Sequence, residues 1–155
     1  MTPANGIRLE DCTPEDRHLV RNVVLAALGQ AGLTPDDPDL ALLEDLPASV
    51  TAAGGSCLAL HIGESICGSV AGRPSREYPG SWNLCWIALL PDWRGMGLGR
   101  QLGETLRDRA AEAGARAMRV ALPARLSPLA GFFNTLGFRE ADPLADDGLC
   151  LTWRW

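Results

Sequence analysis

Residues 89–106 of the chain, LLPDWRGMGLGRQLGETL, join a strand to a helix through a glycine-rich loop. The residues before this loop, 82–90, form an apolar run that is typical of a buried strand. After the loop, Leu98, Leu102 and Leu106 recur at every fourth position, which is the spacing of an amphipathic helix. The pattern predicts a strand–loop–helix unit, and the rest of the fold is built around it.

The glycines of the loop favour a binding site for a phosphate-bearing ligand. A helix N-terminus leaves backbone N–H groups unpaired and carries a partial positive charge. Gly95, Gly97 and Gly99 keep side chains off that surface, so that a phosphate can approach the backbone closely. Arg94 and Arg100 flank the glycines and can add charge-assisted hydrogen bonds. The spacing therefore predicts a cradle for a pyrophosphate.

Two well-known phosphate-binding loops do not fit this sequence. A Walker loop ends in Gly-Lys-Ser/Thr, whereas the chain contains no lysine. A dinucleotide-binding loop requires Gly-x-Gly-x-x-Gly, and the third glycine is replaced by Arg100 when counting from Gly95, or by Leu102 when counting from Gly97. The glycines taken alone also fit an ordinary turn before a helix, and that alternative stays open at this point.

Charge is distributed unevenly along the 155 residues, whose net charge is −5 and whose 14 cations are all arginines. Residues 93–139 contain eight arginines and three acids, whereas residues 1–50 contain nine acids and three arginines. A local cluster of arginines in an acidic protein can receive a small anionic ligand. The negative net charge and the lack of an extended basic face argue against a nucleic-acid partner.

Nothing in the sequence is typical of a membrane or secreted protein. The longest apolar run, residues 84–90, has seven residues, whereas a membrane helix needs about 20. The N-terminal residues lack the order of a secretory signal. The five cysteines are never in Cys-x-x-Cys spacing, and there are only two histidines, so no metal site is predicted. We therefore expect a cytoplasmic protein with reduced thiols.

The other predicted elements surround the central unit in a single domain over residues 1–155. Gly63, Glu64 and Ser65 separate two apolar runs and indicate a hairpin. The predicted strands cover residues 7–11, 57–62, 66–72, 82–90, 118–122 and 149–155, and the predicted helices begin at Thr13-Pro14, after Asp37-Pro38, at Leu98 and at Ser127-Pro128. This order indicates an α+β fold with a mostly antiparallel sheet and helices on its faces.

Residues 89–106 resemble the acetyl-CoA loop of the GNAT superfamily of N-acyltransferases, whose pattern is Arg/Gln-x-x-Gly-x-Gly/Ala. Arg94, Gly97 and Gly99 lie at the positions of that pattern. Residues 132–138, FFNTLGF, resemble the second half-motif of the family and follow in the right order. The resemblance implies a GNAT-like central mixed sheet, mostly antiparallel, with a splayed pair of cofactor-binding strands and helices on both faces.

The resemblance also implies acetyl-CoA as co-substrate and assigns its binding residues. Main-chain groups of Ile87, Ala88 and Leu89, on a bulged strand, would hold the pantetheine arm. A backbone N–H at Leu89 would contact the oxyanion that develops when the acceptor amine attacks the thioester directly. The pyrophosphate would be held by the residues of the loop, namely Arg94, Gly95, Met96, Gly97, Leu98, Gly99 and Arg100.

The sequence departs from the family pattern at its acid and base positions. Asn83 stands where many members have a Glu, Phe133 where relatives have a Tyr, and Leu126 where an Asn often precedes the helix. Losing a positioned acid or base typically lowers a rate by about 10² to 10⁴. A thiol with a pKa near 8.5 is nevertheless a tolerable leaving group, so amide formation can survive these changes.

Other residues are candidates for the missing roles. Glu77 and Tyr78 precede the strand at residue 82, close to where substrates of the family enter, and a solvated loop is the alternative interpretation. His61 and Cys85 are weaker candidates, since a surface or packed histidine and a buried structural thiol explain them better. Asn83 and Glu77 are therefore the catalytic side chains that this sequence offers.

The acceptor is the least defined part of the function. The stretch at residues 36–45 is strongly acidic, which suggests a cationic small-molecule amine as acceptor, with solvated acid-rich turns as the alternative. Two functions remain, an N-acetyltransferase and an acetyl-CoA-binding sensor or interaction module with little catalysis. The expected partners are acetyl-CoA and a small amine acceptor, without nucleic acid or membrane, and a homodimer is left open.

Overall fold

The chain, as a computed structural model, is described over residues 7–30, 48–122, 130–143 and 149–155. Its elements in chain order are β1 (Ile7–Asp11), the 3-10 helix η1 (Pro14–Asp16), α1 (Arg17–Gln30), α2 (Ala48–Ala52), β2 (Ser56–Ile62), β3 (Ser65–Pro74), β4 (Ser81–Leu89), the 3-10 helix η3 (Pro91–Trp93), α3 (Leu98–Glu112), β5 (Ala117–Leu122), α4 (Ala130–Leu136), β6 (Arg139–Pro143) and β7 (Leu149–Arg154).

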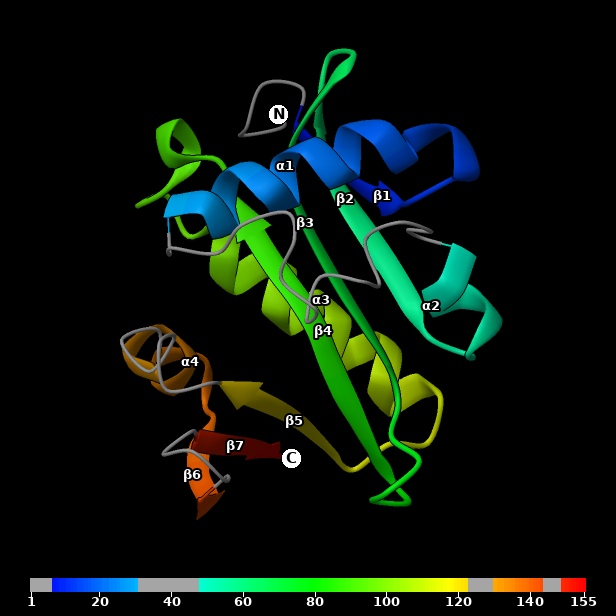
Figure 1. Cartoon of the computed structure of the whole chain (residues 1–155), viewed down its shortest axis with the longest axis vertical. Coiled ribbons are helices and arrows are strands. Elements are labelled where there is room, and N and C mark those ends of the chain that lie inside the picture. Colours follow the sequence, from blue (N-terminus) through cyan, green and yellow to red (C-terminus); the bar gives the residue numbers. More distant parts are fainter. Residues whose placement is uncertain (1–6, 31–47, 123–129, 144–148) are drawn as a thin grey trace.

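The strands form one seven-stranded sheet in the order β1-β2-β3-β4-β5-β7-β6. Only β4 and β5 run parallel, and every other neighbouring pair in the described sheet is antiparallel. α1 crosses one face of the sheet and α3 lies on the other (Figure 1), each above its own cluster of buried side chains. The predicted α+β fold, with a mostly antiparallel mixed sheet and helices on both faces, is confirmed.

β4 and β5 separate soon after they begin. Only residues 81–83 of β4 pair with residues 117–119 of β5. β4 then continues to Leu89 while β5 diverges from it and pairs with β7 (Figure 1). In the described chain, the second half of β4 has β3 along one edge and no strand along the other. The predicted splayed strand pair is present.

A β-bulge in β4 changes which of its residues face each helix. Leu84 and Trp86 pair with consecutive residues of β3, so Cys85 is an extra residue on β4. Trp82 and Leu84 belong to the core cluster beneath α3, whereas Trp86 and Ala88 belong to the cluster beneath α1. Without the bulge these four side chains would share one face, because side chains alternate along a strand.

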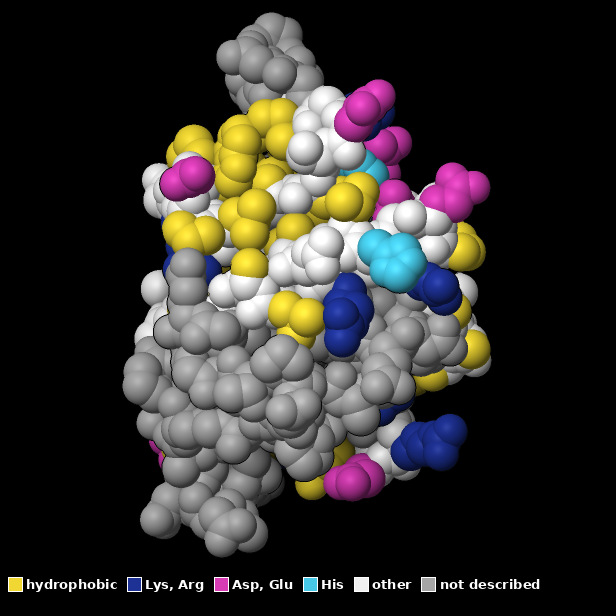
Figure 2. Space-filling view, turned by 45° about the horizontal axis from the view of Figure 1, so that its top comes forward, with side chains coloured by type: hydrophobic (Ala, Val, Ile, Leu, Met, Phe, Trp, Pro, Cys, Tyr) yellow, Lys and Arg dark blue, Asp and Glu magenta, His cyan; other side chains and the backbone are white. Residues whose placement is uncertain are grey.

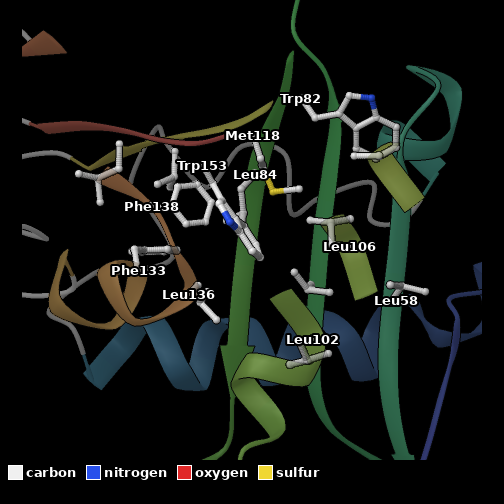
Figure 3. Close-up of a cluster of buried hydrophobic side chains, with 14 of the residues drawn as sticks. Leu58, Trp82, Leu84, Leu102, Leu106, Met118, Phe133, Leu136, Phe138 and Trp153 are labelled. Carbon is white, nitrogen blue, oxygen red and sulfur yellow. The ribbon is translucent and has the colours of Figure 1, made fainter. Parts of the chain in front are cut away.

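The larger core cluster holds α3 and α4 against the sheet. Figure 3 shows Leu102 and Leu106 of α3 extending toward the sheet, together with Met118 of β5 and the rings of Phe138 and Trp153. Leu102, Leu106, Met118 and Phe138 are fully buried. Burying each such side chain contributes roughly 1.5 to 3 kcal/mol, so the leucines that predicted the helix also attach it to the sheet.

The helix predicted at Thr13-Pro14 begins with a single 3-10 turn, η1, before α1. The backbone N–H of Thr13 donates to Asp16 Oδ2 at 2.9 Å, and the pair forms a capping box. The box satisfies donors that a helix start leaves open, so the predicted start is correct although its first turn is tighter.

Two elements are not predicted by the sequence pattern. β6 is a short edge strand with three charged residues and a proline, which conceal a strand signal, and α2 has only five residues. The helix predicted after Asp37-Pro38, Leu126 and the start predicted at Ser127-Pro128 lie outside the described residues.

Figure 2 shows hydrophobic side chains gathered in the upper part of one face of the molecule, with acidic side chains mainly toward the edge of the view. The large hydrophobic side chains that are exposed in the described residues are Leu19, Tyr78, Met96, Phe132 and Trp155. No described helix is both long and apolar enough to cross a membrane.

Gly137 joins α4 to β6 under a steric constraint that can be tested. Its φ is +121°, and an added Cβ would lie 2.5 Å from Nε1 of the buried Trp153. We expect Gly137→Ala to lower the free energy of unfolding by about 2 to 4 kcal/mol, through backbone strain and overpacking, as measured by urea denaturation.

The matched control is Gly63→Ala, in the β2–β3 turn. Its φ is +60°, but an added Cβ meets nothing within 4 Å, so the loss is expected to stay near 1 kcal/mol. Equal losses in the two variants would show that the Trp153 contact does not constrain this turn.

Candidate active site

Two glycines of the loop are required by its backbone conformation. Gly95 has φ +81°, and Gly97, the N-cap of α3, has φ +79° and ψ 4° in the left-handed region. An added Cβ at either position would meet nothing within 4 Å. The turn thus needs glycine for its φ angles, and the space beside both residues is clear of other described atoms and can admit a ligand.

The loop presents backbone donors to that space. The first hydrogen bond within α3 runs from the Gln101 N–H to the Gly97 carbonyl at 3.1 Å. The preceding N–H groups, on Leu98, Gly99 and Arg100, therefore have no partner within the helix. They lie at the positive end of a helix of 15 residues, where an anion is stabilised.

Gly99 has a different role from the other two glycines. An added Cβ there would lie 3.2 and 3.3 Å from atoms of the Phe132 ring. One helical turn later, a Cβ at Gly103 would lie 3.0 Å from Leu136 Cδ1. These glycines allow α4 to pack closely against α3, which fixes the position of the α3 N-terminus relative to α4.

The two arginines that flank the loop have different partners. Arg94 donates from Nε to the Leu89 carbonyl at 3.0 Å, so it connects the loop to the last residue of β4. The Arg100 guanidinium donates to the Thr135 carbonyl at 2.8 Å and lies 3.8 Å from the Glu104 carboxylate. The expectation that both guanidinium groups flank the ligand is therefore too broad, because in this structure that of Arg100 contacts the end of α4.

The edge of β4 presents main-chain groups toward the splay. The Leu90 N–H donates to the Cys67 carbonyl of β3 at 2.9 Å. Because N–H and C=O directions alternate along an antiparallel pair, those of Ala88 also face β3, whereas those of Ile87 and Leu89 face away from it. Of the three residues predicted to hold the pantetheine arm, Ile87 and Leu89 therefore have main-chain groups on the open edge, whereas those of Ala88 face β3.

The two predicted catalytic side chains, Asn83 and Glu77, lie at different distances from the open edge of β4. Asn83 is half-buried, where β4 and β5 are still paired. Glu77 lies before β4, in the turn in which the Ser75 N–H donates to the Ser81 carbonyl at 2.8 Å. The eight steps from Ser81 to Leu89 span about 26 Å, so the structure does not bring Glu77 to the Leu89 end of the strand.

Phe133 lies in the core and offers no proton. It is buried, with ring centroids 5.4 Å from Phe132 and 5.5 Å from Phe138. Both contacts are edge-type arrangements that aromatic rings favour. The position at which relatives have a Tyr is thus a packing position in this protein.

The structure also defines the positions of the two other candidates, His61 and Tyr78. His61 lies on β2, opposite Arg8 of the edge strand β1, and not on the splayed strands. Tyr78 stacks on Arg119, whose Cζ lies 3.6 Å from the ring centroid. Arg119 belongs to β5, opposite Asn83 of β4.

The cysteines are all free thiols, and Cys85 is the one at the bulge. Burial raises the pKa of Cys85 to about 11, although Arg73 acts in the opposite direction. The thiol is therefore protonated at neutral pH, and its nucleophilicity is low. Among the residues that the structure describes, no group of His, Cys, Asp and Glu side chains could hold a metal ion.

Comparison with known proteins identifies the class. The chain belongs to the acetyltransferase (GNAT) family, whose model matches residues 22–138. The predicted family, enzyme class and acetyl-CoA co-substrate are thereby confirmed. No curated protein matches the sequence significantly.

Solved structures share the fold at low sequence identity. A GNAT-family acetyltransferase from Desulfovibrio desulfuricans superimposes with a TM-score of 0.81 at 22% identity, covering 96% of this chain and 99% of that one. PaiA N-acetyltransferase from Thermoplasma acidophilum, solved in complex with coenzyme A, has a TM-score of 0.80 at 14% identity, covering 97% and 99%. These similarities establish the architecture of the chain.

The cradle can be tested with a single added charge. Gly97→Glu places a carboxylate where the loop amides would face the pyrophosphate, and it forces a side chain onto a residue at φ +79°. We expect the affinity for acetyl-CoA, measured by isothermal titration calorimetry, to fall at least about a hundredfold, because like charges repel in the cradle.

Gly63→Glu is the control, since it adds the same charge at a positive φ with nothing within 4 Å. Its affinity should equal that of the unmodified protein. Retained binding by Gly97→Glu would contradict the assignment of the loop.

Proposed function

We propose that the protein transfers an acetyl group from acetyl-CoA to a primary amine of a small-molecule acceptor by direct attack on the thioester. The observation that carries this proposal is the open edge of β4 beside the α3 N-terminus. The edge offers main-chain groups at Ile87 and Leu89, and the loop offers amides to a pyrophosphate. One extended molecule with an anionic end and an amide-containing arm fits both.

The loop and the strand have separate roles in binding. The N–H groups from Arg94 to Arg100 would hold the pyrophosphate, with Gly95, Met96, Gly97, Leu98 and Gly99 between them. The Arg94 side chain, bonded to the Leu89 carbonyl, would keep the loop in register with the strand. The main-chain groups of Ile87 would pair with the amides of the pantetheine arm, much as an added strand would, and the Leu89 N–H would lie beside the thioester.

The reaction that fits this arrangement relies on the main chain. The neutral amine attacks the thioester carbonyl carbon, and the oxygen becomes an oxyanion that accepts a hydrogen bond from the Leu89 N–H. The C–S bond then breaks, CoA leaves as a thiolate, and the nitrogen loses its proton to solvent. No acid is needed to protonate the sulfur, because a thiol pKa near 8.5 makes the thiolate a stable leaving group.

The side chains near the splay are suited to positioning. Asn83 carries an amide, which can orient water or the amine but cannot remove a proton. Glu77 would participate only through an acceptor that reaches the β3–β4 turn. The acidic stretch at residues 36–45, which suggests a cationic acceptor, lies outside the described residues.

A second function is favoured by one specific observation. Asn83 and Phe133 replace the usual base and acid, and Phe133 is a packed core residue. An acetyl-CoA-binding sensor or interaction module would require only the loop and the strand.

Release of CoA thiol distinguishes the two functions. Purified protein is incubated with acetyl-CoA and a panel of primary amines, and free thiol and acetylated product are measured. We expect amine-dependent release above background that is lost in Gly97→Glu. Tight binding of acetyl-CoA without turnover of any amine would favour the binding module.

Cys85 provides a test of direct transfer. Because its pKa is raised to about 11 by burial, the thiol stays protonated at neutral pH and should not accept the acetyl group. We expect Cys85→Ala to keep kcat within about threefold, and mass spectrometry to find no acetylated Cys85 in the unmodified protein. An acetylated Cys85 together with a loss of activity in the variant would indicate a covalent intermediate instead.

A further inference from the structure

Four strands place a row of polar side chains across one face of the sheet. Arg73 of β3 is opposite Asn83 of β4, Asn83 is opposite Arg119 of β5, and Arg119 is opposite Thr152 of β7. Residues directly opposite each other in a sheet share a face. We call Arg73, Asn83, Arg119 and Thr152 the arginine row.

The row lies on the face opposite α3. The neighbours of its members along β4, β5 and β7 are Leu84, Met118 and Trp153, and all three belong to the core beneath α3. Since side chains alternate along a strand, the row faces the α1 side. It lies where β4 and β5 begin to separate.

Neutral groups fix the Arg119 guanidinium in place. Its Cζ lies 3.6 Å from the Tyr78 ring centroid, and it donates to Thr152 Oγ1 at 3.4 Å and to Cys150 Sγ at 3.0 Å. Thr152 and Cys150 are both buried. The planar cation is therefore held by stacking and hydrogen bonds, and none of these neutral partners compensates its charge.

Neither guanidinium of the row has an acidic partner in the described chain. The four ion pairs there involve Arg8, Arg100, Arg107 and Arg109. Arg73 and Arg119 are both half-buried, and arginines in that situation are normally paired with carboxylates or phosphates. Two cations beside the Asn83 amide form a donor set suited to an oxyanion.

We propose, on the basis of the proposed acetyl transfer, that the arginine row binds an oxyanion group of the acceptor. The acceptor is then a small amine that also carries a carboxylate or a phosphate. Asn83 is four residues from Ile87, or about 13 Å along β4. A small molecule anchored there by its oxyanion can present its amine to a thioester beside the open strand.

Matched acceptors test the proposal and distinguish its two forms. Glycine, L-alanine and L-phenylalanine are compared with their carboxamides, and phosphoethanolamine is compared with ethanolamine. We expect one anionic series to have a kcat/KM at least about tenfold above its neutral partners, which is the effect of charge-assisted hydrogen bonds. The carboxamides hold more of their amine deprotonated at neutral pH, so amine basicity works against this result.

Variants connect that preference to the row. Arg73→Gln and Arg119→Gln should each raise KM for the anionic acceptor about tenfold or more, with KM for the neutral partner unchanged. Arg8→Gln, which removes the same charge from the exposed edge strand β1, should change neither. Because each comparison is made within one protein, a general loss of stability moves both acceptors equally.

A binding measurement distinguishes failure of this inference from failure of the proposed function. N-acetyl-L-alanine, its carboxamide and N-acetylphosphoethanolamine are titrated calorimetrically into the CoA-bound protein, which requires no turnover. Tighter binding of an anionic product that is lost in Arg73→Gln supports the row even if no amine is acetylated. Equal binding of charged and neutral products, or a preference that persists in both variants, overturns it whether or not acetyl transfer occurs.

Discussion

The separation of β4 from β5 is the constraint on which the rest of this structure depends. A strand inside a sheet uses its backbone groups on both edges, but β4 is paired with β5 only over residues 81–83. Beyond them, one edge of β4 is left for a ligand that can pair as a strand does. The extra residue at Cys85 shifts the alternation of side chains along β4, so that the side chains of Ile87 and Leu89 lie on the α3 side of the sheet. The loop amides lie directly beyond the end of that edge.

In the proposed reaction, this arrangement makes catalysis depend on backbone geometry. Phe133 is packed between aromatic rings, and Asn83 carries no exchangeable charge, so neither provides the proton transfer expected from a Tyr or Glu. What remains is a preorganised N–H group and a leaving group that is stable without a proton. The high pKa of Cys85 is consistent with this, since a neutral thiol beside the bulge does not compete with the amine for the acetyl group.

The arginines of this protein have several distinct roles that a net charge of −5 conceals. Arg94 bonds to the last carbonyl of β4, and Arg100 bonds to a carbonyl at the end of α4. Arg73 and Arg119 share a row with Asn83 on the other face of the sheet. The basic block expected to serve one anionic cofactor is thus divided between a cofactor loop, helix packing and a proposed acceptor site.

The loop can be predicted from the sequence alone, because its constraints are local. Glycines at positive φ and a helix that begins directly after them can be recognised from neighbouring residues alone, and so can the strand before them. Other features follow from the folded structure alone. Gly99 leaves room for the Phe132 ring, and Arg100 contacts α4. Glu77 is remote from Leu89, and Arg73 and Arg119 share a row. Each of these depends on strand register or helix packing, which join positions far apart in the chain and leave no local pattern.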